Sequence, residues 1–198
     1  MAAGRDLFSE HHPEGVTVDE VIRAAGISKQ TFYNHFSDKD ALAVDILREA
    51  RLQIDGLVAD AYADEPDPAR RIATALCIYA AQALADRQLG QIITRLSLDD
   101  VSPSSPNNAP VLADVRAGLE SGRLAVLSIE TGVAFVIGAC RSLVSRALLN
   151  RHPALAAATA QQFIILVLRA FAIPPIEAEI IATDIVARHL ATTTADQD

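Results

Sequence analysis

The sequence is poor in lysine, cysteine and aromatic residues, and each shortage excludes something. Only two of its 17 basic residues are lysines, Lys29 and Lys39, and the 198-residue chain has a formal net charge of −8. Phosphate contacts need Lys and Arg, so this charge argues against tight, indiscriminate binding to nucleic acid. With six Phe, three Tyr and no Trp, aliphatic side chains must fill most of any core.

The cysteines and the apolar stretches give no sign of a metal site or a membrane span. Cys77 and Cys140 belong to no C-x-x-C pair and to no Cys/His cluster with zinc spacing. Residues 1–15 lack the basic start and apolar stretch of a secretory signal. The strongest apolar stretches, 132–140 and 163–168, are shorter than the roughly 18 residues that a span needs. We therefore expect a cytoplasmic protein with two reduced thiols, no metal, no cofactor and no membrane contact.

Apolar side chains recur at helical spacing along most of the chain, which is 51% hydrophobic. No stretch alternates as a strand does, so we predict an all-α fold. The expected helices cover residues 2–10, 18–25, 28–34, 37–62, 69–86, 89–98, 111–121, 129–150, 154–171 and 175–190. Ser37, with Asp40 three residues on, is the predicted N-cap of the long helix at 37–62. The most loop-like segment is 102–110, and residues 192–198 should fray.

Residues 17–36, which read TVDEVIRAAGISKQTFYNHF, form two short predicted helices joined by a tight turn. Thr17 and Glu20 have the spacing of a capping box, which starts the first helix. Gly26 stops this helix, because glycine accepts the positive φ of a helix end. Ser28 is a suitable N-cap for the second helix.

The side chains of these two helices divide into an inward apolar set and an outward polar set. The inward set comprises Ile27, Phe32 and Phe36, which we expect to pack against Leu7, Phe8, Leu42 and Ile46. The outward set comprises Ser28, Lys29, Gln30, Thr31, Tyr33, Asn34 and His35. A helix-turn-helix DNA reader needs this arrangement, because apolar residues fix the angle between the helices while a polar face enters the major groove. Gln30 suits an adenine edge and the Thr31 methyl suits thymine.

Over about 40 positions the N-terminal part of the sequence resembles the TetR family of bacterial helix-turn-helix regulators. The matching residues are Leu7-Phe8, Gly15 to Val18, Ala25 to Ser28, Thr31 to Phe36 and Asp38 to Leu42. The resemblance implies a three-helix helix-turn-helix DNA-binding domain at 1–47. A long fourth helix then joins it to a helical ligand-binding and dimerisation domain at 48–198. It also implies that Thr17, Tyr33, His35 and Lys39 contact the DNA backbone, and that Lys29, Gln30 and Thr31 face the groove.

The function implied by this resemblance is ligand-responsive transcriptional regulation. The expected protein is a repressor that leaves a near-palindromic double-stranded operator when a small, largely hydrophobic molecule binds. The alternative is a helical small-molecule-binding or adaptor protein without functional DNA binding. Residues 1–50 favour this alternative, since they carry five basic and nine acidic side chains, although between 28 and 40 the only acids are Asp38 and Asp40. Nucleophile-elbow, zincin, P-loop and Rossmann motifs are absent, which argues against an enzyme.

The predicted helices at 129–150 and 154–171 are apolar on all sides, so both must be buried on all sides. We expect one side to meet the core and the other to meet a second subunit in a C2 dimer; the alternative is a monomer that encloses the central helix. The resemblance to the TetR family also implies a dimer in which these two helices of each chain pair. The predicted interface residues are Val136, Leu143, Val144, Phe163, Leu166, Val167 and Ala170.

The predicted ligand cavity lies among the fifth to eighth helices. Its expected lining is aliphatic and therefore suits a hydrophobic molecule. The candidate residues are Leu76, Tyr79, Ala83, Ile92, Arg95, Leu96, Phe135 and Ala139. Arg95 and Arg141 are candidate partners for a ligand carboxylate if either points inward.

Overall fold

The computed structural model describes residues 1–96, 105–150 and 152–190. Within these residues the chain contains α-helices and two short 3-10 turns and no strand, which confirms the predicted all-α class. The helices are α1 (Ala2–Glu10), α2 (Val18–Ala25), α3 (Lys29–His35), α4 (Lys39–Ala61), α5 (Pro68–Ala85), α6 (Arg87–Leu96), α7 (Ala109–Glu120), α8 (Ile129–Leu149), α9 (Pro153–Ala170) and α10 (Pro175–His189). The predicted fraying tail and the first part of the predicted 102–110 loop lie outside the described residues.

Side-chain caps explain where the N-terminal helices begin. The Thr17 hydroxyl accepts from the backbone N–H of Glu20, and the Glu20 carboxylate reaches back to Thr17, so the capping box is present. Gly26 follows α2 with φ +65°. The predicted cap of α4 was wrong by one residue: Asp38 accepts from Ala41, while the Ser37 hydroxyl donates to Asp38. The charged carboxylate is the stronger acceptor and takes the N-cap position.

Two clusters of buried side chains hold the helices together. The N-terminal cluster combines α1 to α4 with parts of α5 and α6, and it includes Phe8, Phe32 and Ile46. The larger cluster combines α5 with α7 to α10. Ile27, which we expected in the first cluster, is 37% exposed instead. It lies in the short link between Gly26, which ends α2, and the Ser28 cap of α3.

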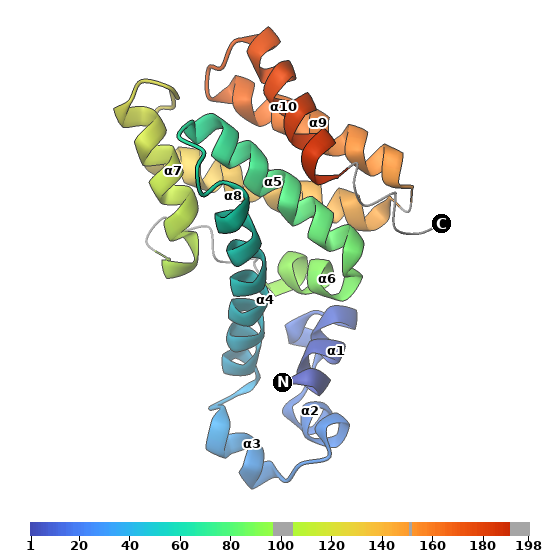
Figure 1. The fold of residues 1–198 in the computed structure, drawn as a ribbon. Helices are drawn as coiled ribbons and strands as arrows, with labels where there is room; N and C mark the ends of the chain where they lie inside the picture. Colours follow the sequence, from blue (N-terminus) through green and yellow to red (C-terminus); the bar gives the residue numbers. More distant parts are fainter. Residues whose placement is uncertain (97–104, 151, 191–198) are drawn as a thin grey trace.

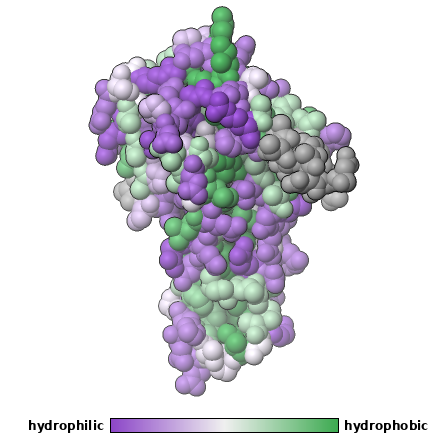
Figure 2. Space-filling model, in the orientation of Figure 1, coloured by the Kyte–Doolittle hydropathy of each residue, from purple (hydrophilic) through white to green (hydrophobic). Residues whose placement is uncertain are grey.

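Helix α4 connects the two ends of the molecule. Figure 1 shows α1 to α3 grouped at one end, with α4 running from them to the helices that form the other end. Helix α6 lies between the two groups and contacts α1, α4, α5 and α8. Figure 2 shows that this face is largely hydrophilic, with smaller apolar areas at the tip of the bundle, in the middle and toward the end formed by α1 to α3. The N-terminal three helices are therefore linked to the rest of the chain through α4 and α6.

Helix α8 corrects the expectation that no apolar stretch is long enough to span a membrane. Among the described residues, this 21-residue helix is the one that passes a test of length and composition for a span. A core helix passes the same test, and α8 contacts α5, α6, α7 and α9. Its Val133 and Leu143 are fully buried against these neighbours. Packing inside the chain thus accounts for part of its apolar composition, since 33% of its most apolar window is buried.

Arginine ion pairs fasten the start of α5 to α10. Arg123 donates to Asp67 at 2.9 Å and 2.8 Å and to Glu177 at 2.6 Å. Arg70 bonds Glu65 at 2.9 Å and also pairs with Asp184 of α10. These carboxylates raise the pKa of Arg123 above its ordinary value. The planar guanidinium suits such two-sided contacts, whereas a lysine offers a point charge.

Candidate functional site

The exposed face of α3 is the first candidate site. Ser28, Lys29, Gln30, Thr31, Tyr33, Asn34 and His35 are all exposed, and Phe32 between them is 2% exposed. The Phe32 ring anchors α3 in the N-terminal cluster and meets the Tyr33 ring edge-on, with centroids 5.4 Å apart. Tyr33 remains 48% exposed. The structure therefore brings seven of the nine predicted DNA-contact residues together on one short helix and its cap.

The two remaining predicted contacts have bonds within the chain. Thr17 is exposed, but its hydroxyl is part of the capping box with Glu20. Lys39 is half-buried, and its ammonium donates to the carbonyl oxygens of Pro13 at 2.7 Å and Val16 at 3.0 Å, with Glu14 at 3.5 Å. Lys39 thus ties the start of α4 to the turn before α2. Its position favours a role in orienting the N-terminal helices over a direct phosphate contact.

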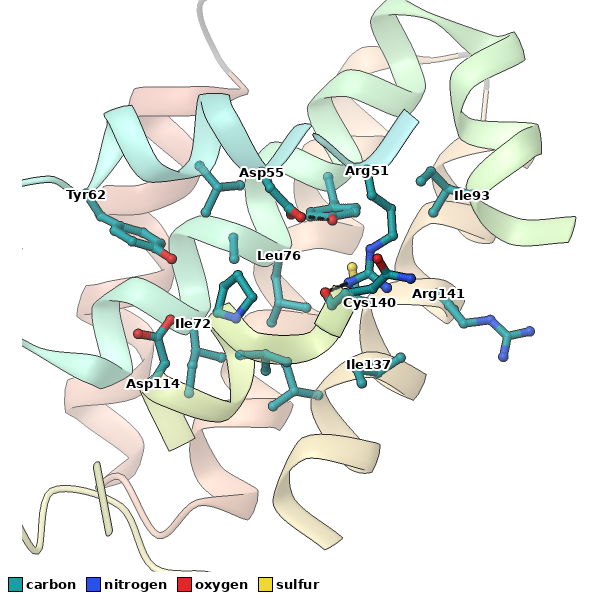
Figure 3. A pocket seen from close by; sticks show the side chains of 17 residues that line it. Arg51, Asp55, Tyr62, Ile72, Leu76, Ile93, Asp114, Ile137, Cys140 and Arg141 are labelled. Atoms are coloured by element: carbon teal, nitrogen blue, oxygen red, sulfur yellow. Dashed lines mark hydrogen bonds between the residues drawn. The ribbon is translucent and has the colours of Figure 1, made fainter. Parts of the chain in front are cut away.

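A partly enclosed cavity of about 90 Å³ is the second candidate site. Side chains of α4, α5, α6, α7 and α8, with the turn before α7, surround it, and Figure 3 shows many of them pointing into one space. The lining residues are Arg51, Asp55, Val58, Tyr62, Ile72, Ala75, Leu76, Tyr79, Ile93, Asn107, Pro110, Val111, Asp114, Val136, Ile137, Cys140 and Arg141. The walls are mainly aliphatic, with polar groups at separate points.

One cluster of hydrogen-bonded polar side chains at the cavity connects α4 to α5 and to the turn before α7. The Tyr79 hydroxyl donates to the Asp55 carboxylate at 2.7 Å, and burial raises the pKa of both side chains. Arg51, one turn before Asp55, donates to the Asn107 carbonyl at 2.7 Å and to the Asn108 side chain at 3.1 Å. The dashed lines in Figure 3 mark interactions of this kind among the lining residues. Arg51 therefore connects α4 to the start of α7.

A second cluster of polar side chains surrounds Asp114 of α7. This residue is 3% exposed, and Arg71 of α5 pairs with its Oδ1 at 2.8 Å. The Arg71 guanidinium also lies over the Tyr62 ring, 4.6 Å from the centroid. Burial raises the pKa of the Asp114 carboxyl to about 6, although Arg71 and Tyr62 act in the opposite direction. Asp114 is thus a buried acid that titrates close to neutral pH.

Only some of the residues that we predicted to line the cavity do so. Leu76 and Tyr79 line it, as do Ile93 and Arg141, although Figure 3 shows the Arg141 side chain directed away from the other polar groups. The remaining candidates lie elsewhere, which corrects the prediction: Ala83, Ile92, Arg95, Leu96, Phe135 and Ala139. Ala83 is buried against Gly90 where α5 and α6 touch, so no space remains there. Phe135 lines a separate open hollow with Leu127 and Phe171.

Sequence reasoning missed the contribution of α4, although a signal was present. Arg51, Asp55, Val58 and Tyr62 follow one another at intervals of three and four residues, which puts them on one face of a helix. Because this face of α4 carries two charged and two largely apolar side chains, it indicates a cavity wall that is mainly apolar and has polar groups at one place. The participation of α7 had no comparable sequence pattern.

The predicted interface residues fall into a buried and an accessible group. The structure buries Val136, Leu143, Val144 and Val167 within the single chain, and Val136 lines the cavity. These four correct the prediction, because burial within the single chain leaves almost none of their surface for a second copy. Phe163 is half-buried, and Leu166 and Ala170 are exposed. The accessible apolar face of α8 and α9 includes Phe135, Leu149, Leu155 and Leu166.

The fold and these two sites define a helix-turn-helix protein whose long fourth helix leads to a helical bundle with an internal cavity. Residues 1–46 match the family model described as bacterial regulatory proteins, tetR family. An HTH-type transcriptional regulator, AlkX of Mycobacterium tuberculosis, is 31% identical over 136 residues, which are 68% of this chain and 62% of AlkX. An uncharacterised HTH-type regulator of Haemophilus influenzae is 38% identical over 60 residues, 30% of this chain and 29% of that protein.

The likeness in fold extends over nearly the whole chain. The crystal structure of RolR without ligand superposes with a TM-score of 0.67, at 22% identity, over 92% of this chain and 94% of RolR. In sequence, the chain spans less than two thirds of either curated relative. The N-terminal helices therefore match the TetR family model, and the chain as a whole has the fold of RolR.

Proposed function

We propose that this protein is a ligand-responsive DNA-binding transcriptional regulator, acting as a homodimeric repressor and not as an enzyme. The observation that carries the proposal is the exposed polar face of α3, which presents seven hydrogen-bonding residues around one buried anchor, Phe32. Such a face suits the major groove, where side chains read base edges. Lys29, Gln30 and Thr31 face the bases, while Tyr33 and His35 meet phosphate oxygens.

The position of the cavity supports control by a small molecule. Helix α4 begins a few residues after α3, and α4 with its C-cap contributes Arg51, Asp55 and Tyr62 to the cavity. Helix α6 contributes Ile93 to the cavity and contacts α1, where Gln88 donates to Asp6 at 2.7 Å. A ligand that prefers one arrangement of α4 and α6 therefore shifts the position of the reading helices. RolR has been crystallised with resorcinol, which supports a small-molecule effector for this fold.

The apolar face of α8 and α9 supports a second copy as partner. Leu149, Leu155 and Leu166 are each more than half exposed on two adjacent helices, and helix–helix pairing across a two-fold axis would cover them. A dimer also places two α3 helices about one DNA turn apart, which fits a near-palindromic operator.

The proposal is tested by measuring whether the protein binds the DNA that lies upstream of its own gene. Fluorescence anisotropy at about 50 mM and about 200 mM salt should show sequence-selective binding that weakens with salt. Tyr33→Ala should weaken binding at least tenfold, because it removes a hydrogen bond to a charged phosphate. Arg188→Ala, which removes a positive charge from α10, serves as the matched control and should bind as the wild type. Absence of binding at low salt would favour the alternative, a helical small-molecule-binding or adaptor protein.

A further inference from the structure

The exposed face of α3 carries a single permanent positive charge, and a carboxylate lies beside it. Lys29 is the one lysine or arginine of α3, and its Nζ lies 3.7 Å from Oδ1 of Asp19. Asp19 belongs to the first turn of α2, and the side chains of Asp19 and Lys29 are 72% and 66% exposed. The buried residues of the two helices, Val21 and Phe32, belong to the N-terminal cluster. The ion pair therefore connects α2 to α3 on the side that faces solvent.

Stability offers only a small reason for this pair. Exposed ion pairs contribute little to the free energy of unfolding, because water screens them and two flexible side chains lose freedom. The helix dipole favours an acid in the first turn of α2, but Glu20 already supplies one there. Glu20 also completes the capping box with Thr17, in which Asp19 takes no part. The effect of Asp19 must therefore be sought in what the exposed face of α3 contacts.

The charge of the N-terminal helices makes the state of Lys29 important for DNA binding. Residues 1–50 carry five basic and nine acidic side chains, so few cations are available to neutralise phosphates. Binding to unrelated DNA depends almost wholly on such cations. A carboxylate 3.7 Å from the Lys29 ammonium cancels much of its charge at the distance of a phosphate, and it also repels the phosphate itself. An approach to the DNA backbone alone therefore gains little from Lys29.

A base edge offers Lys29 what the DNA backbone does not. Lys29 is the first residue of α3, at the end of the helix that contacts base edges in helix-turn-helix proteins. O6 and N7 of guanine are two acceptors that suit an ammonium group there. In an operator these acceptors replace Asp19 at a fixed position, whereas a scrambled sequence lacks them in that register.

We propose that Asp19 is a positioning residue that raises the selectivity of DNA binding. Its carboxylate holds the Lys29 ammonium over the N-terminus of α3 and keeps it from phosphates, so that binding to unrelated DNA is weakened more than binding to the operator. The inference rests on the function proposed above, because it concerns a protein that reads DNA through α3. It gives α2 a part in selectivity that acts through Lys29.

Fluorescence anisotropy with two duplexes of equal length, the DNA upstream of the gene and a scrambled copy of it, tests the inference. Asp19→Asn should strengthen binding to the scrambled duplex about threefold or more at about 50 mM salt, and binding to the upstream DNA by less. The ratio of the two affinities should fall accordingly. The slope of log affinity against log salt for the scrambled duplex should steepen by about 0.9, the value for one more neutralised phosphate.

Three further variants separate the role of Asp19 from a simple loss of negative charge. Asp45→Asn removes an equal charge from a solvent-accessible pair on α4, where Asp45 lies 2.9 Å from Arg48, and should leave the affinity ratio unchanged. Asp19→Glu keeps the carboxylate and should retain the wild-type ratio. In a Lys29→Gln background, Asp19→Asn should no longer change the ratio, because the ammonium that Asp19 holds is gone.

The outcomes distinguish this inference from the proposed function. If the wild type prefers the upstream DNA while Asp19→Asn and Asp45→Asn behave alike, the role of Asp19 is overturned and the regulator stands. An effect of Asp19→Asn that persists in the Lys29→Gln background would also overturn it, since general repulsion would then suffice. A wild type that binds neither duplex, or both equally, would refute the proposed function and this inference with it. Each altered side chain is at least 41% exposed, so none of these variants disturbs the core.

Discussion

Lys39 is a single side chain that connects the start of α4 to the turn before α2. Its ammonium binds the carbonyls of Pro13 and Val16, so Lys39→Met should leave these oxygens without a charged partner. We expect the free energy of unfolding to fall by about 1–3 kcal/mol, the usual cost of losing such bonds. Urea denaturation measures the difference.

Lys29 provides the matched control for this change. Its side chain is exposed, and its pair with Asp19 is 3.7 Å long. Lys29→Met should therefore change stability by less than about 1 kcal/mol, as exposed ion pairs do. If the two variants lost equal stability, the bonds of Lys39 to the turn would have no structural importance.

Asp114 should make stability depend on pH in an unusual direction. Its pKa is raised from 3.8 to about 6 in the folded protein, so between these values the folded state binds more protons than the unfolded state. The contribution of Asp114 to the free energy of unfolding therefore falls as the pH rises from about 4 to about 6, by about 3 kcal/mol in total. Asp114→Asn removes this dependence, and the stability of the variant relative to the wild type should rise over that range.

Urea titrations of both proteins at pH 4, 5, 6 and 7 check this prediction. The comparison is needed because Asp67 and Asp184, whose pKa values are lowered by arginine partners, lose stability as pH falls. Both proteins share these groups, so they cancel in the difference. Parallel curves for the two proteins would show that Asp114 keeps an ordinary pKa.

At the level of the elements, the sequence predicted the helices far better than the cavity. Caps and breaks are local signals, and Thr17, Gly26 and Ser28 act in the structure as the sequence suggested. The ends of the observed helices lie within two residues of the predicted ranges. The cavity depends on which faces of distant helices meet. Asp114 acquires its role only because α7 packs on α5 beside Arg71.

The end of α9 contains a residue in a conformation that suits glycine. Ala172 has φ +65°, and its N–H bonds the Arg169 carbonyl at the helix end. A side chain there costs roughly 1 kcal/mol relative to glycine. Ala172→Gly should therefore raise the free energy of unfolding by about 1 kcal/mol, measured by thermal or urea denaturation. Ala158→Gly, on an exposed turn of α9, should do the reverse.

For the whole molecule, the proposed dimer predicts a link between assembly and DNA affinity. Leu166 is 62% exposed on α9, and Leu166→Arg would place a charge in the α8–α9 interface. The variant should sediment as a monomer and bind operator at least tenfold more weakly, because one recognition helix makes half of the contacts. Its secondary structure should be unchanged.

Ile180 on α10 tests the location of this interface, since it is also 62% exposed. Ile180→Arg should leave the dimer intact and the operator affinity unaltered. Sedimentation of both variants decides between the two surfaces. A dimer that survives Leu166→Arg and dissociates with Ile180→Arg would move the interface to α10.

The scarcity of lysine gives the molecule a practical property. Of its two lysine ammonium groups, that of Lys39 is held by backbone carbonyls, whereas that of Lys29 stands exposed on α3. Apart from the chain's N-terminal amine, an amine-reactive fluorophore should therefore label Lys29 first. The dye would sit on the helix proposed to read DNA, where its emission would report occupancy of that surface from within the protein.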